Sequence, residues 1–379
     1  MKATGPGKAG RRGAALYIML LVTPVVLAMT VCAFETGYIA FARHRLQNAA
    51  DAAALAGAAK LQAPYMQWSY PLVSASQKAS ILAAAQQSAQ TEAARLAGLN
   101  GDGAVTSYAL PAADVTFGYL DQNNTYSSPP PNSGFPNSVA VTLRRNQQAN
   151  GSLALLLGPI LGVASADLTA TARATVYSNP TTMKSLPGFK NYMLPIQADV
   201  NAWTQFVTNG TSIGANNQVI PGPNGAPQLQ VYPDSSNQGH FGLLDLGPPA
   251  SNTPAYQNWI DNGPSSSDIQ YLLDNRMLPV SPAAPAQWTP GPGLKSALIS
   301  DFQWIEGRQA LIPLSSGPGS AQIIGFVGVT ITEAYGSGGN MVIAVQPMAV
   351  QDPTAALGVP LGTGPGPVTF AFLPARLTQ

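Results

Sequence analysis

The chain is poor in charged residues, cysteine and histidine, and each shortage excludes a class of function. Only 9% of its 379 residues are charged, one is cysteine and two are histidine. One cysteine cannot form an internal disulfide, a cysteine-based zinc site or an iron–sulfur site. Beyond the N-terminal tail the basic residues form no cluster, so nucleic-acid binding finds no support. Ordinary core packing must therefore stabilise the folded part.

A membrane-length apolar segment is the main feature that the sequence does contain. Residues 14–34 include no charged side chain, and about twenty such residues are needed to cross ~30 Å of hydrocarbon. Pro24 lies in the middle, where a membrane helix tolerates proline with a kink. Lys2, Lys8, Arg11 and Arg12 precede the segment with no acid among them, whereas both signs of charge follow it. Because basic residues favour the cytoplasmic side, we expect a cytoplasmic N-terminus and export of everything after residue 34.

A cleaved signal peptide is the alternative interpretation of this segment. Val31 and Ala33 are small residues at the positions that a signal peptidase inspects. The apolar run, however, is longer than the 7–15 residues usual in a signal peptide, and alanine-rich sequence follows without a turn signal. The sequence thus favours an uncleaved anchor, and cleavage after Ala33 stays open.

An alanine-rich tract continues from the apolar segment and predicts a helical stalk. Alanine is the best helix former, and small or apolar residues recur here at spacings of three and four. Small residues let helix backbones approach closely. The stripe can pack against a partner helix or against the chain's own second alanine-rich helix, expected near residues 74–96. The anchor and packing residues are Pro24, Glu35, Leu46, Ala49, Ala50, Ala53, Ala54 and Gly57.

Two stretches resemble a known family. They are LQNAADAAALAGA at residues 46–58, and VAVTLRR at 139–145 with LALLLGPILGVASADLTATA at 153–172. Both resemble the TadE/TadG-like proteins of bacterial Flp (tight-adherence) pilus assembly and secretion systems. The resemblance covers most of residues 11–178 and implies an inner-membrane accessory protein with other Tad or Flp components as partners. Family members usually carry Asp where Glu35 stands, a change that keeps the acid.

The resemblance does not extend to two properties of related proteins. Some relatives carry a metal-binding von Willebrand A domain, but the string that begins at Asp234 lacks the second serine of that site. A processed pilin needs glutamate at the fifth position after its cleavage site; cleavage at Gly13 would put Ile18 there. We therefore expect no metal site, and an accessory protein rather than a polymerising pilin.

The pattern predicts an α+β fold behind a single-pass transmembrane helix. Residues 1–13 form a cytoplasmic tail, 14–61 the membrane helix and alanine-rich stalk, 62–180 a TadG-like exported α+β domain, and 190–379 a second, β-rich exported domain. Strands are expected at 105–110, 114–120, 138–145 and 167–177, and a short buried helix at 152–161. The mixed helices and antiparallel sheets would all lie outside the cytoplasm.

Catalytic motifs are weak. Residues 210–214 match the G-x-S-x-G nucleophile motif around Ser212, with Asp234 and His240 following. That motif needs a strand before it and a helix after it, and the sequence here favours a polar turn. His44 fits the polar face of the stalk. We therefore predict no catalytic residue, no cofactor site and no metal site.

The hypothesis from sequence is a membrane-anchored structural protein of Flp/Tad-type pilus assembly or secretion, linked to cell adhesion, that acts by protein–protein packing. It would lie in the bacterial inner membrane with its bulk in the periplasm, contact other Tad or Flp components, and self-associate through the alanine-rich helix. The alternative is an exported enzyme or ligand-binding protein that uses a TadG-like anchor, with its activity in residues 190–379.

Overall fold

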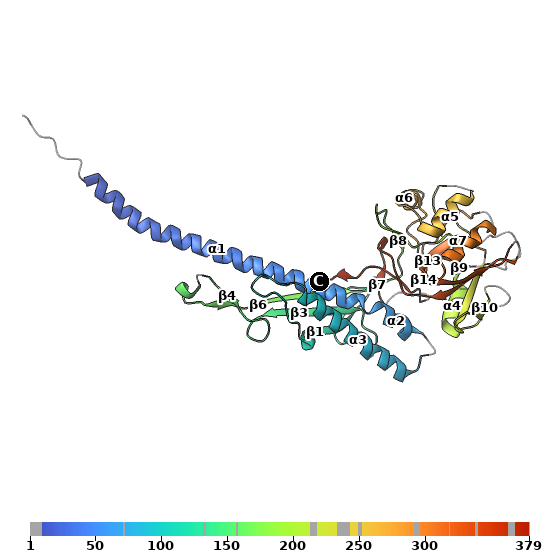
Figure 1. Cartoon of the computed structure of the whole chain (residues 1–379), viewed down its shortest axis with the longest axis horizontal. Coiled ribbons are helices and arrows are strands. Elements are labelled where there is room, and N and C mark those ends of the chain that lie inside the picture. The colour runs from blue at the N-terminus through green and yellow to red at the C-terminus, as the bar shows by residue number, and fades with distance from the viewer. Residues whose placement is uncertain are drawn as a thin grey trace, which may run out of the picture. The chain divides into compact units, whose positions relative to one another are not determined.

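A computed structural model describes residues 10–70, 73–131, 134–156, 158–212, 218–232, 243–248, 252–291, 294, 296–317, 319–337, 340–362 and 368–378 (Figure 1). The chain divides into two compact units, each built from several segments. Unit 1 contains Met1–Ala53, Ala94–Val115 and Val141–Ala172, and unit 2 contains Ala54–Ala93, Thr116–Ala140 and Arg173–Gln379. The four-part domain division expected from the sequence stays a prediction.

Three helices open the chain. Helix α1 runs without interruption over Gly10–Ala59, which confirms that the apolar segment and the alanine-rich tract form one rod. A turn at Lys60 separates it from the short helix α2 (Gln62–Ser69). Helix α3 (Ala75–Gly98) is the second alanine-rich helix that the sequence predicts.

A five-stranded sheet follows, with strand order β2-β1-β3-β6-β20. Its strands are β1 (Val115–Leu120), β2 (Tyr126–Ser127), β3 (Ser138–Arg145), β6 (Leu168–Thr175) and β20 (Arg376–Leu377). The expected strands at 114–120, 138–145 and 167–177 are thus confirmed. The edge strand β20 comes from the C-terminus and pairs antiparallel with β6, which the sequence did not predict.

One buried amide joins this sheet to the C-terminal part of unit 2. Asn137 is fully buried, and its Nδ2 donates to the carbonyls of Leu120 (2.9 Å) and Leu361 (3.0 Å). Its Oδ1 accepts from the Leu120 amide at 2.8 Å. Residues more than two hundred positions apart are therefore tied by a single side chain.

Two local predictions are wrong. Residues 105–110 form no strand, because the preceding turn is held by Asp102, whose Oδ1 accepts from the amides of Ala104 and Val105. The segment expected as a buried helix at 152–161 is instead a hairpin, made of β4 (Leu153–Ala154), the 3₁₀ turn η3 (Gly158–Leu161) and β5 (Ser165–Ala166). Pro159 cannot donate an α-helical hydrogen bond, and that favours the turn.

The second sheet lies in unit 2 and has the order β10-β11-β15-β14-β13-β9, with β12 paired to β14. The strands are β9 (Ala198–Asp199), β10 (Val219–Pro221), β11 (Pro227–Tyr232), β12 (Ala286–Gln287), β13 (Gln309–Ser315), β14 (Gln322–Tyr335) and β15 (Val342–Pro347). All neighbours pair antiparallel except β13 and β9, which are parallel.

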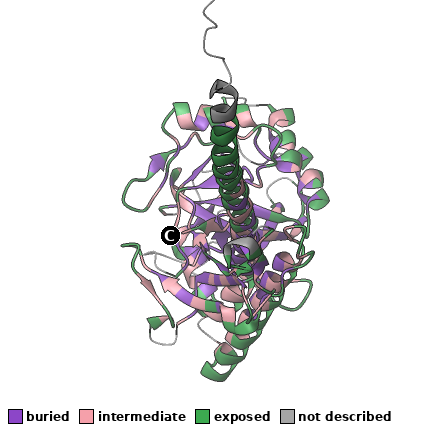
Figure 2. Cartoon of the chain, turned by 90° about the vertical axis from the view of Figure 1, so that its left-hand side faces the viewer, coloured by how far each residue is buried: buried purple, intermediate pink, exposed green. Residues whose placement is uncertain are grey.

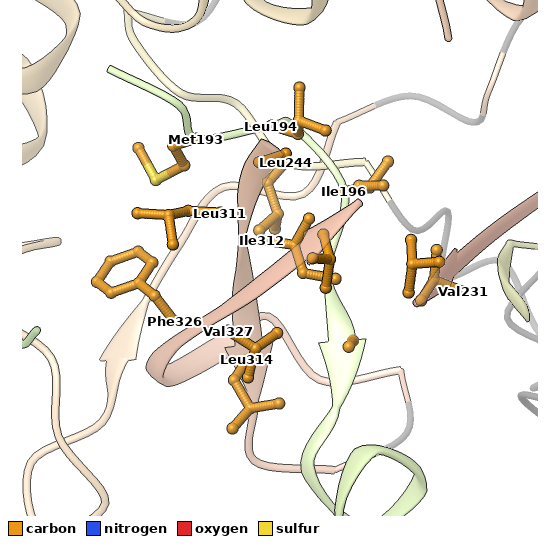
Figure 3. Close-up of a cluster of buried hydrophobic side chains, with 14 of the residues drawn as sticks. Met193, Leu194, Ile196, Val231, Leu244, Leu311, Ile312, Leu314, Phe326 and Val327 are labelled. Carbon is orange, nitrogen blue, oxygen red and sulfur yellow. The ribbon is translucent and has the colours of Figure 1, made fainter. Parts of the chain in front are cut away.

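Helices pack around this sheet to complete its core. They are α4 (Val200–Asn209), α5 (Thr253–Asn262), α6 (Ser266–Asp274), η4 (Ser296–Leu298) and α7 (Ile299–Trp304). Figure 3 shows Leu311 and Ile312 of β13 beside Phe326 and Val327 of β14, all fully buried. The smaller strands form two further sheets: β16 (Val350–Gln351), β19 (Ala371–Phe372), β7 (Tyr177–Ser178) and β18 (Val359–Pro360) in one, β17 (Ala355–Ala356) and β8 (Thr182–Met183) in the other.

Candidate functional site on the N-terminal helix

The apolar part of α1 is exposed along its whole described length. From Leu16 to Thr30 every side chain is exposed, and the best 18-residue window has a mean hydropathy of 2.3. Figure 2 shows this stretch as an unbroken exposed helix. A helix this long and apolar can cross a membrane. Pro24 lies in it, exposed like its neighbours.

Threonine hydroxyls in and just after this segment donate hydrogen bonds within the helix. Thr23, Thr30 and Thr36 each donate a hydrogen bond to the carbonyl four residues earlier, at 2.8, 2.8 and 2.7 Å. A hydroxyl facing lipid has no water partner, so such bonds lower the cost of placing threonine in hydrocarbon. The polar side chains of the segment are thus compatible with a lipid environment.

Side chains of α1 begin to be buried at the end of the apolar segment. Glu35 is only 7% exposed and takes part in an interaction within the chain. One turn later, Tyr38 lies within electrostatic reach of Arg145 at the end of β3. Arg145 forms a buried ion pair with Asp102, and burial lowers the pKa of its guanidinium, an effect that Tyr38 opposes. The first turns of α1 beyond the apolar segment are therefore packed against the rest of unit 1, a contact that the sequence pattern did not predict.

The predicted packing stripe is buried within the single chain. Leu46, Ala49, Ala50, Ala53 and Ala54 have no exposed surface, and Gly57 is buried as well. The stripe extends further than the sequence analysis proposed, since it also includes the buried Ala42, Ala58 and Leu61. Their spacing of three and four residues continues the predicted pattern and could have been used to find them.

Helix α3 carries a matching stripe. Ala85, Ala89, Ala93 and Ala97 recur every four residues, and each is at most 1% exposed. A Cβ built at Gly57 would lie 3.2 Å from the Ala89 carbonyl oxygen and 3.4 Å from the Cβ of Ala93. The same atom would lie 3.2 Å from Cγ1 of Val139 on β3. In unit 2 the two helices therefore meet at Gly57 at a distance that leaves no room for a larger side chain.

Two glutamines connect α1 and α2 to distant main-chain carbonyls, and the sequence pattern indicated neither contact. Gln47 donates from Nε2 to Asp51 one turn later (2.7 Å) and to the carbonyl of Thr171 on β6 (2.9 Å). The buried Gln62 donates to the carbonyl of Leu373 at 3.1 Å. A polar side chain at helical spacing carries no sign of such distant main-chain partners.

The other candidate residues are not brought into one described site. Ser212 accepts a hydrogen bond from the Val219 amide at 2.7 Å, as a residue in a polar turn does. Asp234 and His240 lie outside the described residues. His44 is exposed on α1. Among the described residues, no group of three or more His, Cys, Asp or Glu is placed to hold a metal ion; the predicted lack of metal and catalytic sites stays a prediction.

The second region has a cavity of about 290 Å³, lined in part by Lys190, Asp261 and Arg308. Lys190 donates from Nζ to the Asp261 carbonyl at 3.1 Å. Burial raises the pKa of the Asp261 carboxyl, the nearby Asp301 raises it further, and Arg308 and Lys190 oppose that shift. The cavity thus presents two cationic side chains beside a carboxyl whose pKa is raised.

Comparison with known families matches the N-terminal part of the chain. Residues 13–60 match a family described as putative Flp pilus-assembly TadE/G-like, and residues 56–174 match one described as putative Tad-like Flp pilus-assembly. No curated protein and no solved structure matches the chain. The resemblance inferred from residues 46–58 and 139–172 is thereby confirmed, and residues 175–379 lie outside both matches.

Proposed function

We propose, from the matches of residues 13–60 and 56–174 to the TadE/G-like and Tad-like families of Flp pilus-assembly proteins, that the chain is an anchored structural protein of that assembly. It crosses the inner membrane once through α1, keeps its N-terminus in the cytoplasm and holds its folded units outside. It acts by packing against other pilus or secretion components rather than by catalysis. A role related to pilus assembly follows from the families; topology and mode of action are the proposal.

The continuity of α1 is the observation that carries this proposal. One helix is apolar over residues 16–34, exposed at every residue from 16 to 30, and then carries a buried stripe from Ala42 to Ala58. Exposure of an apolar stretch of this length to water is unfavourable in free energy, whereas the hydrocarbon of a membrane accommodates it. The same rod thus joins a segment suited to lipid directly to the folded part of the chain.

Topology is tested by reporter fusions to the full chain. Alkaline phosphatase fused to the C-terminus should be active, and green fluorescent protein at the same place should be dark, because only the first folds after export. Leu21→Arg should reduce membrane insertion, since arginine at the centre of a membrane helix costs about 2.5–3.5 kcal/mol. A cytoplasmic C-terminus, or a soluble mature form beginning at Phe34, would overturn the proposal.

Structural action is tested by assembly. The full chain should co-purify with other pilus components after crosslinking, and Ser212→Ala and His240→Ala should leave surface piliation unchanged. The rival function, binding or catalysis by residues 190–379, has the cavity at Lys190 and Arg308 in its favour. If Lys190→Ala together with Arg308→Ala abolishes piliation while the unfolding transition is unchanged, the rival is supported.

A further inference from the structure

The hairpin formed by β4, η3 and β5 exposes apolar side chains at its tip. Leu156 is 62% exposed and Val163 is 55% exposed. No charged residue occurs between Arg145 and Asp167, and the hairpin base is polar, with Ser152 donating to Asp167 at 2.5 Å. An apolar tip on a polar base is the distribution expected of a segment that enters a less polar phase.

Main-chain hydrogen bonds close the described part of the tip. The Val163 amide donates to the Gly158 carbonyl (2.9 Å), and the Leu155 amide donates to the Ala164 carbonyl (3.1 Å). Pro159 has no amide proton to satisfy. A Cβ at Gly158 would lie 2.0 Å from the Val163 carbonyl oxygen, so glycine is needed to close the turn. Internal hydrogen bonds lower the cost of taking a turn out of water.

Contacts within unit 1 place this tip along α1. The bond from Gln47 to the Thr171 carbonyl sets β6 beside the helix, and Arg145 near Tyr38 shows that the strand ends lie toward its N-terminal side. Val163 precedes Thr171 by eight residues, about 26 Å of extended chain at ~3.3 Å per residue. The same length corresponds to about 17 residues of helix, which reaches back from Gln47 to about Thr30.

Figure 1 shows the same arrangement, with the β4 hairpin extending along α1 toward its N-terminal half. The uncharged segment of α1 ends at residue 34. The tip therefore reaches the level at which α1 would already be in lipid. We propose that the β4–β5 hairpin inserts Leu156 and Val163 into the outer face of the bilayer that α1 crosses, as a second membrane contact of unit 1; this rests on the membrane anchoring proposed above.

Two contacts with one bilayer restrict the chain more than a single helix does. A lone helix leaves the exported part free to rotate about the bilayer normal and to tilt. A second insertion point fixes the tilt of unit 1 and the face of the sheet that points away from the membrane. We assign lipid rather than another protein to the tip because the tip lies beside α1 at the level where the apolar surface of the anchor begins.

The test measures lipid contact in the full chain reconstituted into vesicles of phosphatidylethanolamine and phosphatidylglycerol. An environment-sensitive nitrobenzoxadiazole label is attached in detergent to the native Cys32, or to Leu156→Cys, Val163→Cys or Leu99→Cys in a Cys32→Ala chain. Leu99 is the matched control, a leucine of unit 1 that is 68% exposed. Lipids carrying a nitroxide near the headgroup then quench any label that contacts the bilayer.

Labels at residues 156 and 163 should lose emission with nitroxide lipids as the Cys32 label does, while the Leu99→Cys label keeps its emission. Adding Leu156→Asp to the Val163→Cys chain should abolish the quenching there, and adding Leu99→Asp should not. If Cys32 is quenched but residues 156 and 163 are not, the hairpin proposal fails and the anchor stands. A blue-shifted but unquenched label at the tip would mean that protein covers it, which also overturns the proposal. If the Cys32 label is itself unquenched, the anchoring fails, and the hairpin proposal fails with it.

Discussion

Two glycines of α1, Gly37 and Gly57, differ in how much space surrounds them. A Cβ at Gly57 would meet three atoms at 3.2–3.4 Å, whereas a Cβ at Gly37 would meet none within 4 Å. Replacing glycine by alanine inside a helix stabilises the helix by about 1 kcal/mol. Adding a methyl group to a well-packed contact costs about 1–3 kcal/mol. We expect Gly37→Ala to stabilise the chain and Gly57→Ala to leave it unchanged or less stable.

The difference between the two variants reports mainly the packing cost, because both add the same methyl group to α1. Urea unfolding of the detergent-solubilised chain should put Gly57→Ala below Gly37→Ala by about 1–3 kcal/mol. Gly57→Leu should widen the difference, since its neighbours include the main-chain oxygen of Ala89, which cannot rotate away. Equal unfolding free energies for both alanine variants would show that α1 and α3 do not meet as closely as described.

Three further outcomes follow from residues of unit 2. Asn137→Ala leaves three main-chain groups without their side-chain amide partner and should lower the free energy of unfolding by at least about 2 kcal/mol. The control Asn258→Ala, at an exposed position, should change that free energy by less than about 0.5 kcal/mol. Burial raises the pKa of Tyr65 and of Tyr70 to about 12 from 10.0, and the nearby Tyr119 adds to the shift at Tyr65. The folded state therefore holds these two protons more tightly, and the stability that they add is present below pH 10 and is lost as the pH rises toward 12. Tyrosinate absorbance measured during a pH titration should show this late ionisation. Deleting residues 374–379 removes β20 and should speed proteolysis within β6, its pairing partner; an unchanged cleavage rate would contradict that role.

Local pattern was enough to predict much of the fold. The uncharged run, the alanine-rich tract and the period-two strands each carry a signal within a few residues, and α1, α3, β1, β3 and β6 lie where that signal places them. The stripe on α1 was visible because helical spacing collects small residues on one face. The partner of the stripe could not be predicted, because an alanine-rich helix shows the same pattern whether it packs against a helix of its own chain or against another protein.

Long-range pairing accounts for what the sequence did not reveal. Strand β20 is two residues long, and only its pairing with β6 defines it. Gln62 and Asn137 each donate to a main-chain carbonyl more than two hundred positions away. The hairpin at 153–166 differs from the helix expected there because a short apolar run fits a buried helix as well as a strand.

The burial of the stripe changes how a loss of assembly should be interpreted. Ala53 is fully buried within one chain, so Ala53→Leu would disturb the chain's own packing whether or not a partner helix is ever present. The exposed residues on the same turns are different, since Arg43, His44 and Asn48 are more polar than the residues of the stripe. A partner that binds this part of α1 after folding must meet that polar face. Its binding would depend on salt, as contacts between exposed charges do, whereas contacts between small apolar residues would not.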